Sequence, residues 1–279
     1  MVKSSKAFAP ANISCIFQIY EHKNPRWMGS YGAGFTLNRG VFARVSKSAK
    51  TIVLFNGKNI SFPTVKSTIK KLTKEKLRIS IKSKLPLGCG FGLSGACALA
   101  AAIAANKLLR LKKTQKELAA AAHTAEVENK TGLGDVVNQL HGGFCVKLAP
   151  SSYFKVQKLP INNVNVYCRH FGKLSTKSII TSRKLAHNIN KSAAEGLKKL
   201  KKLMESGAQI NLSDMIKLSK EFAAESGLLK DKKTAETIKG IEQDNGNASM
   251  IMLGNAVFSD KKFKGSIRLK ISDAGAHVL

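Results

Sequence analysis

A glycine-rich loop is the first feature of this sequence that could do chemistry. Three glycines alternate with other residues in the run Pro86-Leu87-Gly88-Cys89-Gly90-Phe91-Gly92-Leu93-Ser94-Gly95, which we name the glycine loop. Glycines let backbone N–H groups approach an anion closely, and the alanine-rich helix predicted to follow adds free N–H groups and the positive end of its dipole. The glycine loop therefore predicts a phosphate-binding site. A tight turn that uses glycine for positive φ is the alternative.

Two common phosphate loops fit this segment poorly. A Walker A loop ends in Gly-Lys-Ser/Thr, and the glycine loop contains no lysine. Gly90–Gly95 does match the GxGxxG pattern of dinucleotide-binding folds. That pattern requires a second strand and then an acid about 20 residues on, whereas here a second helix follows and contains Glu117. The sequence therefore indicates a phosphate loop of another kind.

Acidic residues are scarce before the glycine loop and then gather after it. Residues 1–116 hold two acids, and the next 19 residues hold four: Glu117, Glu126, Glu128 and Asp135. Magnesium on a nucleoside triphosphate takes hydroxyl and carboxylate oxygens, which Ser94 and Glu126 could supply. Asp135 follows a turn flanked by glycines and could receive or orient the proton of an acceptor hydroxyl. Considered alone, these helix acids would be ordinary solvated residues.

The charge balance bears on the partners of the protein. The chain of 279 residues has 47 Lys and Arg against 17 Asp and Glu, a net charge of +30, with a globular share of apolar residues. The basic residues are 39 Lys and only 8 Arg. Nucleic-acid readers favour the planar fork of arginine, so this ratio argues against nucleic acid and for a lysine-rich solvated surface. Part of the charge would attract anionic substrates.

The cysteines and the hydropathy of the sequence indicate the cellular compartment in which the protein is expected. The five cysteines show no paired spacing, and the start of the chain lacks the apolar run of a signal peptide, which predicts reduced thiols in a cytoplasmic protein. The most apolar stretch, residues 95–105, is too short to span a bilayer. We therefore expect no membrane partner.

The elements around these residues mix strands and helices without strict alternation. Ala33–Val45 predicts two strands joined at Asn38-Arg39-Gly40, and Asn56-Gly57 predicts a hairpin turn. Thr114 and Glu117 form a capping-box pattern at the start of a helix. Amphipathic helices are expected near 183–206, 213–224 and 233–244. We expect two α+β domains, over residues 1–150 and 151–279.

These motifs resemble those of the GHMP kinases, the superfamily of galactokinase, homoserine kinase and mevalonate kinase. Pro86–Ala96 is similar to the family motif Pro-Leu-Gly-x-Gly-Leu-Gly-Ser-Ser-x-Ala, although Leu93 replaces its first Ser. The resemblance implies that ATP is bound by Pro86, Gly88, Gly90, Gly92, Leu93, Ser94, Gly95 and Ala96. It implies that Ser94 and Glu126 bind Mg²⁺ and that Asp135 is the catalytic residue.

Within the superfamily the sequence is most similar to the pantoate kinases of archaea. That likeness implies ATP and pantoate as substrates, with pantoate bound by Ser30, His123 and Lys147. Two departures stand out: Lys147 replaces an arginine, and Ala9-Pro10-Ala11-Asn12 stands where the family has Ala-Pro-Gly-Lys or, in these enzymes, a histidine at the last position. Asn12 therefore removes a cation expected beside Asp135.

The resemblance also implies a fold and an activity. The amino-terminal half would be similar to domain 2 of ribosomal protein S5 and the carboxy-terminal half would be ferredoxin-like, in a homodimer. The implied reaction is phosphorylation of pantoate to 4-phosphopantoate in coenzyme A biosynthesis. Two alternatives are another GHMP kinase, acting on homoserine, mevalonate or a sugar, and a basic nucleic-acid-binding protein with the ribosomal fold.

Overall fold

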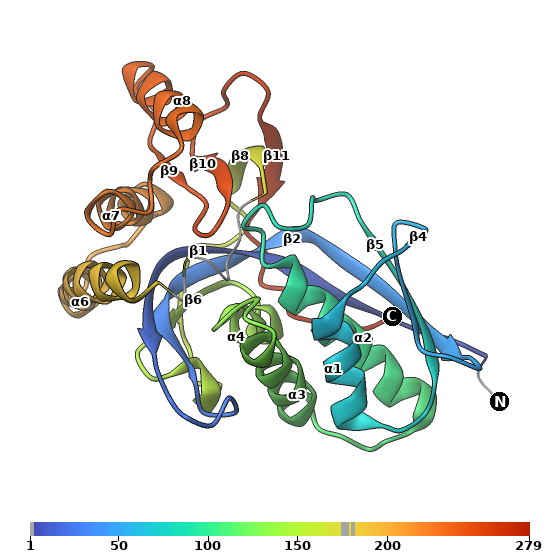
Figure 1. Ribbon diagram of the computed structural model, residues 1–279. Helices are drawn as coiled ribbons and strands as arrows, with labels where there is room; N and C mark the ends of the chain where they lie inside the picture. Colours follow the sequence, from blue (N-terminus) through green and yellow to red (C-terminus); the bar gives the residue numbers. More distant parts are fainter. Residues whose placement is uncertain (1–2, 174–178, 180–181) are drawn as a thin grey trace.

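The computed structural model describes residues 3–173, 179 and 182–279, which form two β-sheets with helices packed against them (Figure 1). The strands of the larger sheet are β1 (Ser5–Tyr20), β2 (Gly29–Lys47), β3 (Ile52–Phe55), β4 (Lys58–Asn59), β5 (Leu77–Ser83), β6 (Phe144–Lys147), β7 (Gln157–Leu159) and β12 (His277–Val278). Their order is β12-β1-β2-β5-β3-β4, with β6 paired to β2 and β7 to β6. This arrangement confirms the predicted α+β class.

A long antiparallel hairpin of β1 and β2 runs through the larger sheet. Most residues of β1 are buried, because two helices pack against the strand and two others pack against its second half. The prediction of two strands within Ala33–Val45 was wrong, since β2 continues through that segment. The register with β1 shifts between Pro10 and Asn12, so the turn-forming residues around Asn38 are accommodated as an irregularity within one strand.

Four helices cover one face of this sheet. They are α1 (Pro63–Leu72), α2 (Leu93–Leu109), α3 (Gln115–Glu128) and α4 (Asp135–His141). Helix α2 is the central one, and it is buried on all sides because its small alanine side chains let β1, β2 and the other helices approach closely. Thr114 and Glu117 form the predicted capping box at the start of α3.

The smaller sheet and three further helices form the other part of the molecule. Its strands are β8 (Asn165–Gly172), β9 (Ala248–Met250), β10 (Asn255–Ser259) and β11 (Ile267–Lys270), in the order β11-β8-β10-β9, and its helices are α6 (Arg183–Glu205), α7 (Leu212–Glu225) and α8 (Lys232–Gln243). The three helices confirm the predicted ranges. Strands β7 and β12 lie beyond residue 150 and pair with the larger sheet, and we keep residue 150 as a proposed boundary.

Three connections meet where the two parts of the molecule face each other. The glycine loop runs from β5 to α2, a turn at residues 129–134 joins α3 to α4, and a turn at residues 251–254 joins β9 to β10. A side chain at Gly254 would collide with the Cys89 carbonyl, so the third turn packs directly on the glycine loop. Within the described residues, no helix is long and apolar enough to cross a membrane.

Candidate active site

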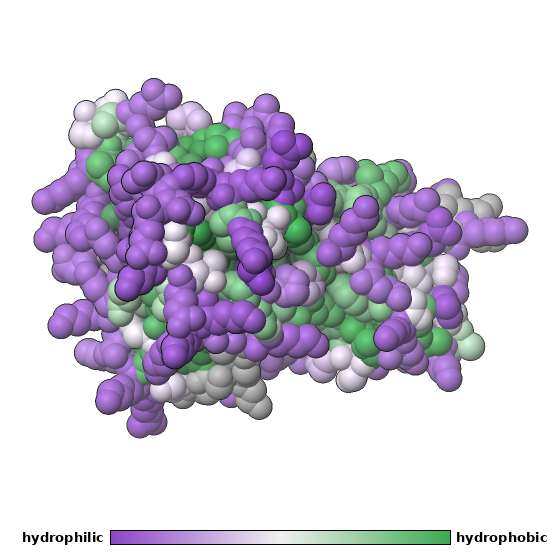
Figure 2. Space-filling view, turned by 90° about the horizontal axis from the view of Figure 1, so that it is seen from above, coloured by the Kyte–Doolittle hydropathy of each residue, from purple (hydrophilic) through white to green (hydrophobic). Residues whose placement is uncertain are grey.

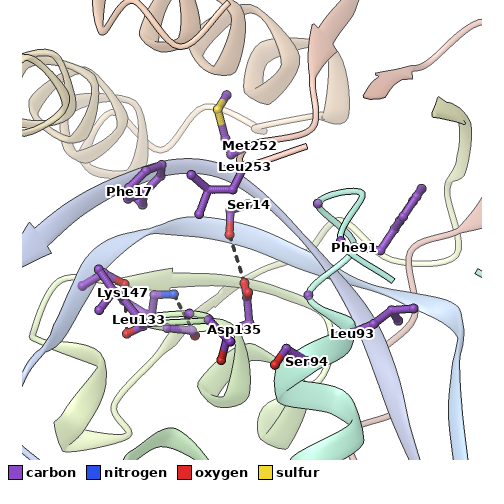
Figure 3. Close-up of a pocket in the computed structure, with 17 residues that line it drawn as sticks. Ser14, Phe17, Phe91, Leu93, Ser94, Leu133, Asp135, Lys147, Met252 and Leu253 are labelled. Atoms are coloured by element: carbon purple, nitrogen blue, oxygen red, sulfur yellow. Dashed lines mark hydrogen bonds between the residues drawn. The ribbon is translucent and has the colours of Figure 1, made fainter. Parts of the chain in front are cut away.

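A pocket lies at the junction of these three connections (Figure 3). Its lining from the glycine loop is Gly88, Gly90, Phe91, Gly92, Leu93 and Ser94; from the turn before α4 it is Thr131, Gly132, Leu133, Gly134 and Asp135; other elements add Ser14, Phe17, Ser30, Lys147, Met252 and Leu253. Eight of the residues singled out from the sequence are therefore brought together: Ser30, Gly88, Gly90, Gly92, Leu93, Ser94, Asp135 and Lys147.

The glycine loop is held in a conformation that requires glycine. Gly88, Gly90 and Gly92 have φ values of +78°, +85° and +60°, where a side chain would be strained. The backbone N–H of Asn12 donates to the Phe91 carbonyl at 3.0 Å, and Gln139 Nε2 donates to the Gly92 carbonyl at 2.7 Å. Strand β1 and helix α4 thus fix the shape of the loop from behind.

The start of helix α2 presents free backbone donors to the pocket. Gly92 is its N-cap residue, no side chain caps the helix, and its first turn contains no acid. Ala96 is the first residue whose N–H reaches back to the Gly92 carbonyl, which leaves the N–H groups of Leu93, Ser94 and Gly95 without a helical acceptor. Donors of this kind, with the positive end of the helix dipole, suit a phosphate group.

Ser94 and Glu126 place two buried side-chain oxygens beside the pocket. Ser94 Oγ and Glu126 Oε2 are buried, and neither makes a hydrogen bond of good geometry among the described residues, although the Ser94 hydroxyl is close enough to the Glu126 carboxyl to lower its pKa. A Cβ atom added at Gly95 would lie 2.7 Å from Glu126 Oε2, and one at Gly132 would lie 2.6 Å from it, so two glycines make room for this carboxylate. An unsatisfied hydroxyl and carboxylate fit the oxygen donors that Mg²⁺ prefers.

Burial dominates the protonation of Glu126. Desolvation and the nearby negative charge of Asp135 raise its pKa to about 8, and a hydrogen bond from the Thr131 hydroxyl opposes this rise. Burial therefore favours the neutral form of the carboxyl group when no cation is bound. A metal ion would favour its ionised form, since a cation stabilises the carboxylate that ligates it.

Asp135 begins helix α4 and is held by two neutral donors from β1. Asn12 Nδ2 donates to its Oδ1 at 2.7 Å, and Ser14 Oγ donates to the same oxygen at 3.3 Å. Asn138 Nδ2 donates to Asn12 Oδ1 at 2.9 Å, which turns the Asn12 amide so that its NH₂ group faces the aspartate. Asn12, which the sequence marked as a departure from the family, is therefore a hydrogen-bonding neighbour of Asp135.

A cation near Asp135 comes from the opposite side of the pocket. Burial raises the pKa of Asp135, and the ammonium of Lys147 on β6 lowers it, together with the hydrogen bonds from Asn12 and Ser14. Lys147 is only 4% exposed, and burial lowers its pKa while Asp135 raises it. Its Nζ donates to the Gly134 carbonyl at 3.2 Å, which leaves ammonium protons free toward the pocket.

Ser30 lies on β2 close to Lys147. A Cβ atom at Gly134 would lie 2.3 Å from Ser30 Oγ and 2.9 Å from Lys147 Nζ, so both groups reach the same turn. A buried serine that the sequence did not single out, Ser151, accepts a hydrogen bond from the Ser30 N–H at 3.0 Å and donates to the Leu133 carbonyl at 2.6 Å. The position of Ser151 in a Ser-Ser segment after Pro150 did not indicate that it would hold β2 and the turn before α4 together.

Five residues singled out from the sequence do not line the pocket. Pro86, Gly95, Ala96 and Glu126 lie around or beneath the lining residues. His123 is buried on α3, where its Nε2 atom pairs with the Met28 carbonyl at 2.8 Å and its Nδ1 atom has no partner among the described residues. Burial lowers the pKa of His123, so it is neutral.

The pocket also contains residues that sequence reasoning missed. Ser14 lies two residues after Asn12 on β1, and the alternation of side chains along a strand could have placed it beside Asp135. Phe17 and Leu133 are apolar residues with no distinguishing pattern, and only the three-dimensional fold identifies them as lining residues.

Comparison with known proteins places this site in context. The family model for the GHMP kinases N terminal domain matches residues 63–143. Pantoate kinase from Methanocaldococcus jannaschii is 34% identical over 91% of this chain and 92% of its own length. Pantoate kinase from Thermococcus kodakarensis is 29% identical over 91% of this chain and 86% of its own length. Homoserine kinase from Sulfurisphaera tokodaii is 35% identical, over only 32% of this chain and 29% of its own length.

Solved structures agree with the sequence relatives. A phosphotransferase related to the CoA biosynthesis pathway is 26% identical, with a TM-score of 0.84 over 99% of this chain and 98% of that chain. Homoserine kinase from Cytophaga hutchinsonii, 20% identical, shares the fold with a TM-score of 0.70 over 100% of this chain and 98% of that chain. These likenesses confirm the two-domain fold expected from the resemblance.

Proposed function

Because this chain belongs to the GHMP kinase family and is an ATP-dependent kinase, we propose that it phosphorylates the primary hydroxyl of pantoate. The product would be 4-phosphopantoate, on the route to coenzyme A. The acceptor oxygen would form a bond to the γ-phosphorus of ATP as the bond from that phosphorus to the β-phosphate oxygen breaks, and ADP would leave. The named relatives and the arrangement of charges around Asp135 support this proposal.

The triphosphate would lie on the glycine loop and the start of helix α2. The free N–H groups of Leu93, Ser94 and Gly95 would donate to phosphate oxygens. Ser94 and Glu126 would hold Mg²⁺, which when bound would neutralise charge on the β- and γ-phosphates. Met252 and Leu253 would help to exclude water from the same end of the pocket.

Asp135 would act on the acceptor hydroxyl. Burial raises its pKa, whereas Lys147, Asn12 and Ser14 lower it, so the carboxylate is a stronger proton acceptor than that of an exposed aspartate. The carboxylate would orient the hydroxyl and receive its proton during transfer. Substitution by asparagine keeps the shape and removes the charge.

The carboxylate of pantoate would be bound by Lys147 and Ser30. The observation that carries this assignment is that Lys147 is buried at the pocket, and its ammonium makes one hydrogen bond, to the Gly134 carbonyl. A buried cation with free donors is costly unless an anion joins it. An arginine fork would grip both oxygens of a carboxylate, whereas a lysine acts as a point charge. His123 does not line the pocket and would act indirectly, by holding the Met28 carbonyl.

A direct test is turnover by the Asp135→Asn variant with ATP, Mg²⁺ and pantoate. We expect kcat to fall by about two to four orders of magnitude, since general base catalysis contributes about that much. The Asp273→Asn variant, which changes an exposed aspartate outside the pocket, is the matched control. Turnover by Asp135→Asn close to that of the wild type would refute the assigned role.

Three broader expectations stay as proposals. We propose a homodimer and a cytoplasmic location, and the five cysteines, all buried as free thiols, agree with a reducing compartment. The proposed domain boundary remains near residue 150. An acceptor of another GHMP kinase, such as homoserine or mevalonate, is the alternative within the family.

A further inference from the structure

Near the amino terminus, the larger sheet has a face that none of the described helices covers. Alternate residues of β1, β2 and β5, such as Ala7, Ala43 and Ile81, point to the helices and are buried. The residues between them point outward. They form what we name the outer face: Lys6, Phe8, Phe42, Arg44, Ser46, Arg78, Ser80, Lys82 and His277. Figure 2 shows the molecule from above, with hydrophilic side chains projecting from the surface and apolar ones between them.

Three aromatic rings lie in a row across the outer face. Phe42 on β2 pairs with Phe8 on β1, which pairs with His277 on β12. The ring centroids of Phe42 and Phe8 are 5.1 Å apart, and those of Phe8 and His277 are 5.5 Å apart. Phe42 is 51% exposed, although a large apolar ring gains most from burial. Phe8 at the centre of the row is only 8% exposed, so the rings open to solvent are those of Phe42 and His277 on either side of it.

The cations of the outer face lack acidic neighbours. Lys6 and Arg44 are directly opposite each other on β1 and β2, an arrangement that repels like charges and weakens the sheet. Lys82 pairs across from Phe42, and Arg78 pairs with Ser46. No outward position of these strands holds an acid. None of these four cations takes part in an ion pair among the described residues.

More cations rim the same surface. Arg39 and Lys84 line a hollow together with Phe42 and Lys82. A second hollow shares Arg39 and is lined by Arg268 of β11. The chain has only eight arginines, and four of them, Arg39, Arg44, Arg78 and Arg268, gather here. The composition alone argued against nucleic acid because arginine is scarce, but the fold places half of the arginines on the outer face or in the hollows at its edge.

We propose that the outer face binds single-stranded nucleic acid, beyond the kinase activity of the separate pocket. Unpaired bases would stack on Phe42, as they do on aromatic side chains of other sheet surfaces. Arg39, Arg44 and Lys82 would contact phosphates on either side. The concentration of positive charge opposes pairing of this face with a second copy of the same chain. A duplex would not expose its bases to the ring.

The test is fluorescence anisotropy of a labelled 12-nucleotide single-stranded RNA titrated with the full-length protein at several salt concentrations. We expect Phe42→Ala to raise Kd at least about fivefold, because stacking on one aromatic side chain contributes that much. Because each phosphate contact adds about 0.7 to the slope of log Kd against log salt, the Arg44→Ala/Lys82→Ala variant should lower that slope by about 1.4.

The matched control removes the same charge from elsewhere. Lys198→Ala/Lys202→Ala alters two exposed lysines of α6, and it should leave the salt slope unchanged. Kinase turnover, which should be unaffected by Phe42→Ala, verifies folding. Absence of RNA binding at 50 mM salt would overturn the proposal. Equal weakening by the control variant, a Phe42→Ala variant that binds like the wild type, or preference for anionic lipid vesicles or duplex over single strand would each overturn it as well.

Discussion

Glu126 gives the site a measurable signature in the stability of the folded chain. The pKa of its carboxyl rises from 4.5 to about 8 because it is buried and close to Asp135. Between these two values the folded chain binds one more proton than the unfolded chain. Its contribution to stability is therefore present at low pH and is lost as the pH rises. The loss is about 1.4 kcal/mol per pH unit.

The Glu126→Gln variant removes this proton uptake while keeping the shape of the side chain. Over the interval from pH 5 to pH 8 the wild type should lose about 3 to 4 kcal/mol relative to the variant, because the slope of about 1.4 kcal/mol per pH unit falls to about half near pH 8. Denaturant unfolding of both proteins at pH 5, 6, 7 and 8 in a chelator measures the difference. Titrating groups that do not interact with Glu126 are common to both proteins and cancel, whereas Asp135, whose charge acts on Glu126, also contributes to the difference.

Two results of that experiment would refute the reasoning. A free-energy difference between variant and wild type that is constant with pH would show that Glu126 is not a buried neutral acid. Repeating the series with saturating Mg²⁺ and a non-hydrolysable ATP analogue tests the ligand assignment, since a bound cation ionises the carboxylate and shrinks the difference. A pH dependence unchanged by the metal and nucleotide would place the ion elsewhere.

Three further predictions follow from the contacts of the pocket. Initial-rate measurements should show that Lys147→Met raises the KM for pantoate at least about tenfold, whereas Lys147→Arg retains part of the affinity. The exposed control is Lys158→Met, and equal KM values for all variants would contradict carboxylate binding. Asn12→Ala removes a hydrogen bond that lowers the pKa of Asp135, so the acidic limb of the pH–rate profile should move to higher pH, and an unmoved limb would contradict this coupling. Gly95→Ala would place a Cβ atom 2.7 Å from Glu126 Oε2 and should weaken the activation of turnover by Mg²⁺, whereas Gly240→Ala on α8, which has open space around it, should leave that activation intact. A normal Mg²⁺ response of the Gly95→Ala variant would show that Glu126 is not a metal ligand.

The local chemistry of the site could be predicted from the sequence. Glycines at alternate positions before a helix restrict the loop to a few conformations, and the capping box at Thr114 fixes where helix α3 begins. These two constraints limit where Glu126 and Asp135, which follow the loop in the sequence, can lie. Gly88, Ser94 and Asp135 accordingly meet in one pocket, as their pattern indicated.

Interactions between distant segments could not be predicted in the same way. Lys147 contacts the Gly134 carbonyl only because β6 pairs with β2, and no local pattern of residues 144–147 indicates that pairing. The local sequence Asn38-Arg39-Gly40 also predicted a turn, whereas the structure has one continuous strand β2 whose pairing with β1 shifts register at this segment. In both cases the outcome depends on pairing between strands that are distant in the sequence.

The most direct test of the central claim is ADP release by the purified enzyme with ATP and Mg²⁺ and a panel of acceptors. The panel should contain pantoate, homoserine, mevalonate and galactose, with Asp135→Asn as the inactive control. We expect kcat/KM for pantoate to exceed that for every other acceptor by at least about a hundredfold. Homoserine carries an ammonium that Lys147 would repel, galactose has no carboxylate, and mevalonate places its primary hydroxyl one carbon farther from its carboxylate than pantoate does. Equal or greater kcat/KM for another acceptor would contradict this expectation.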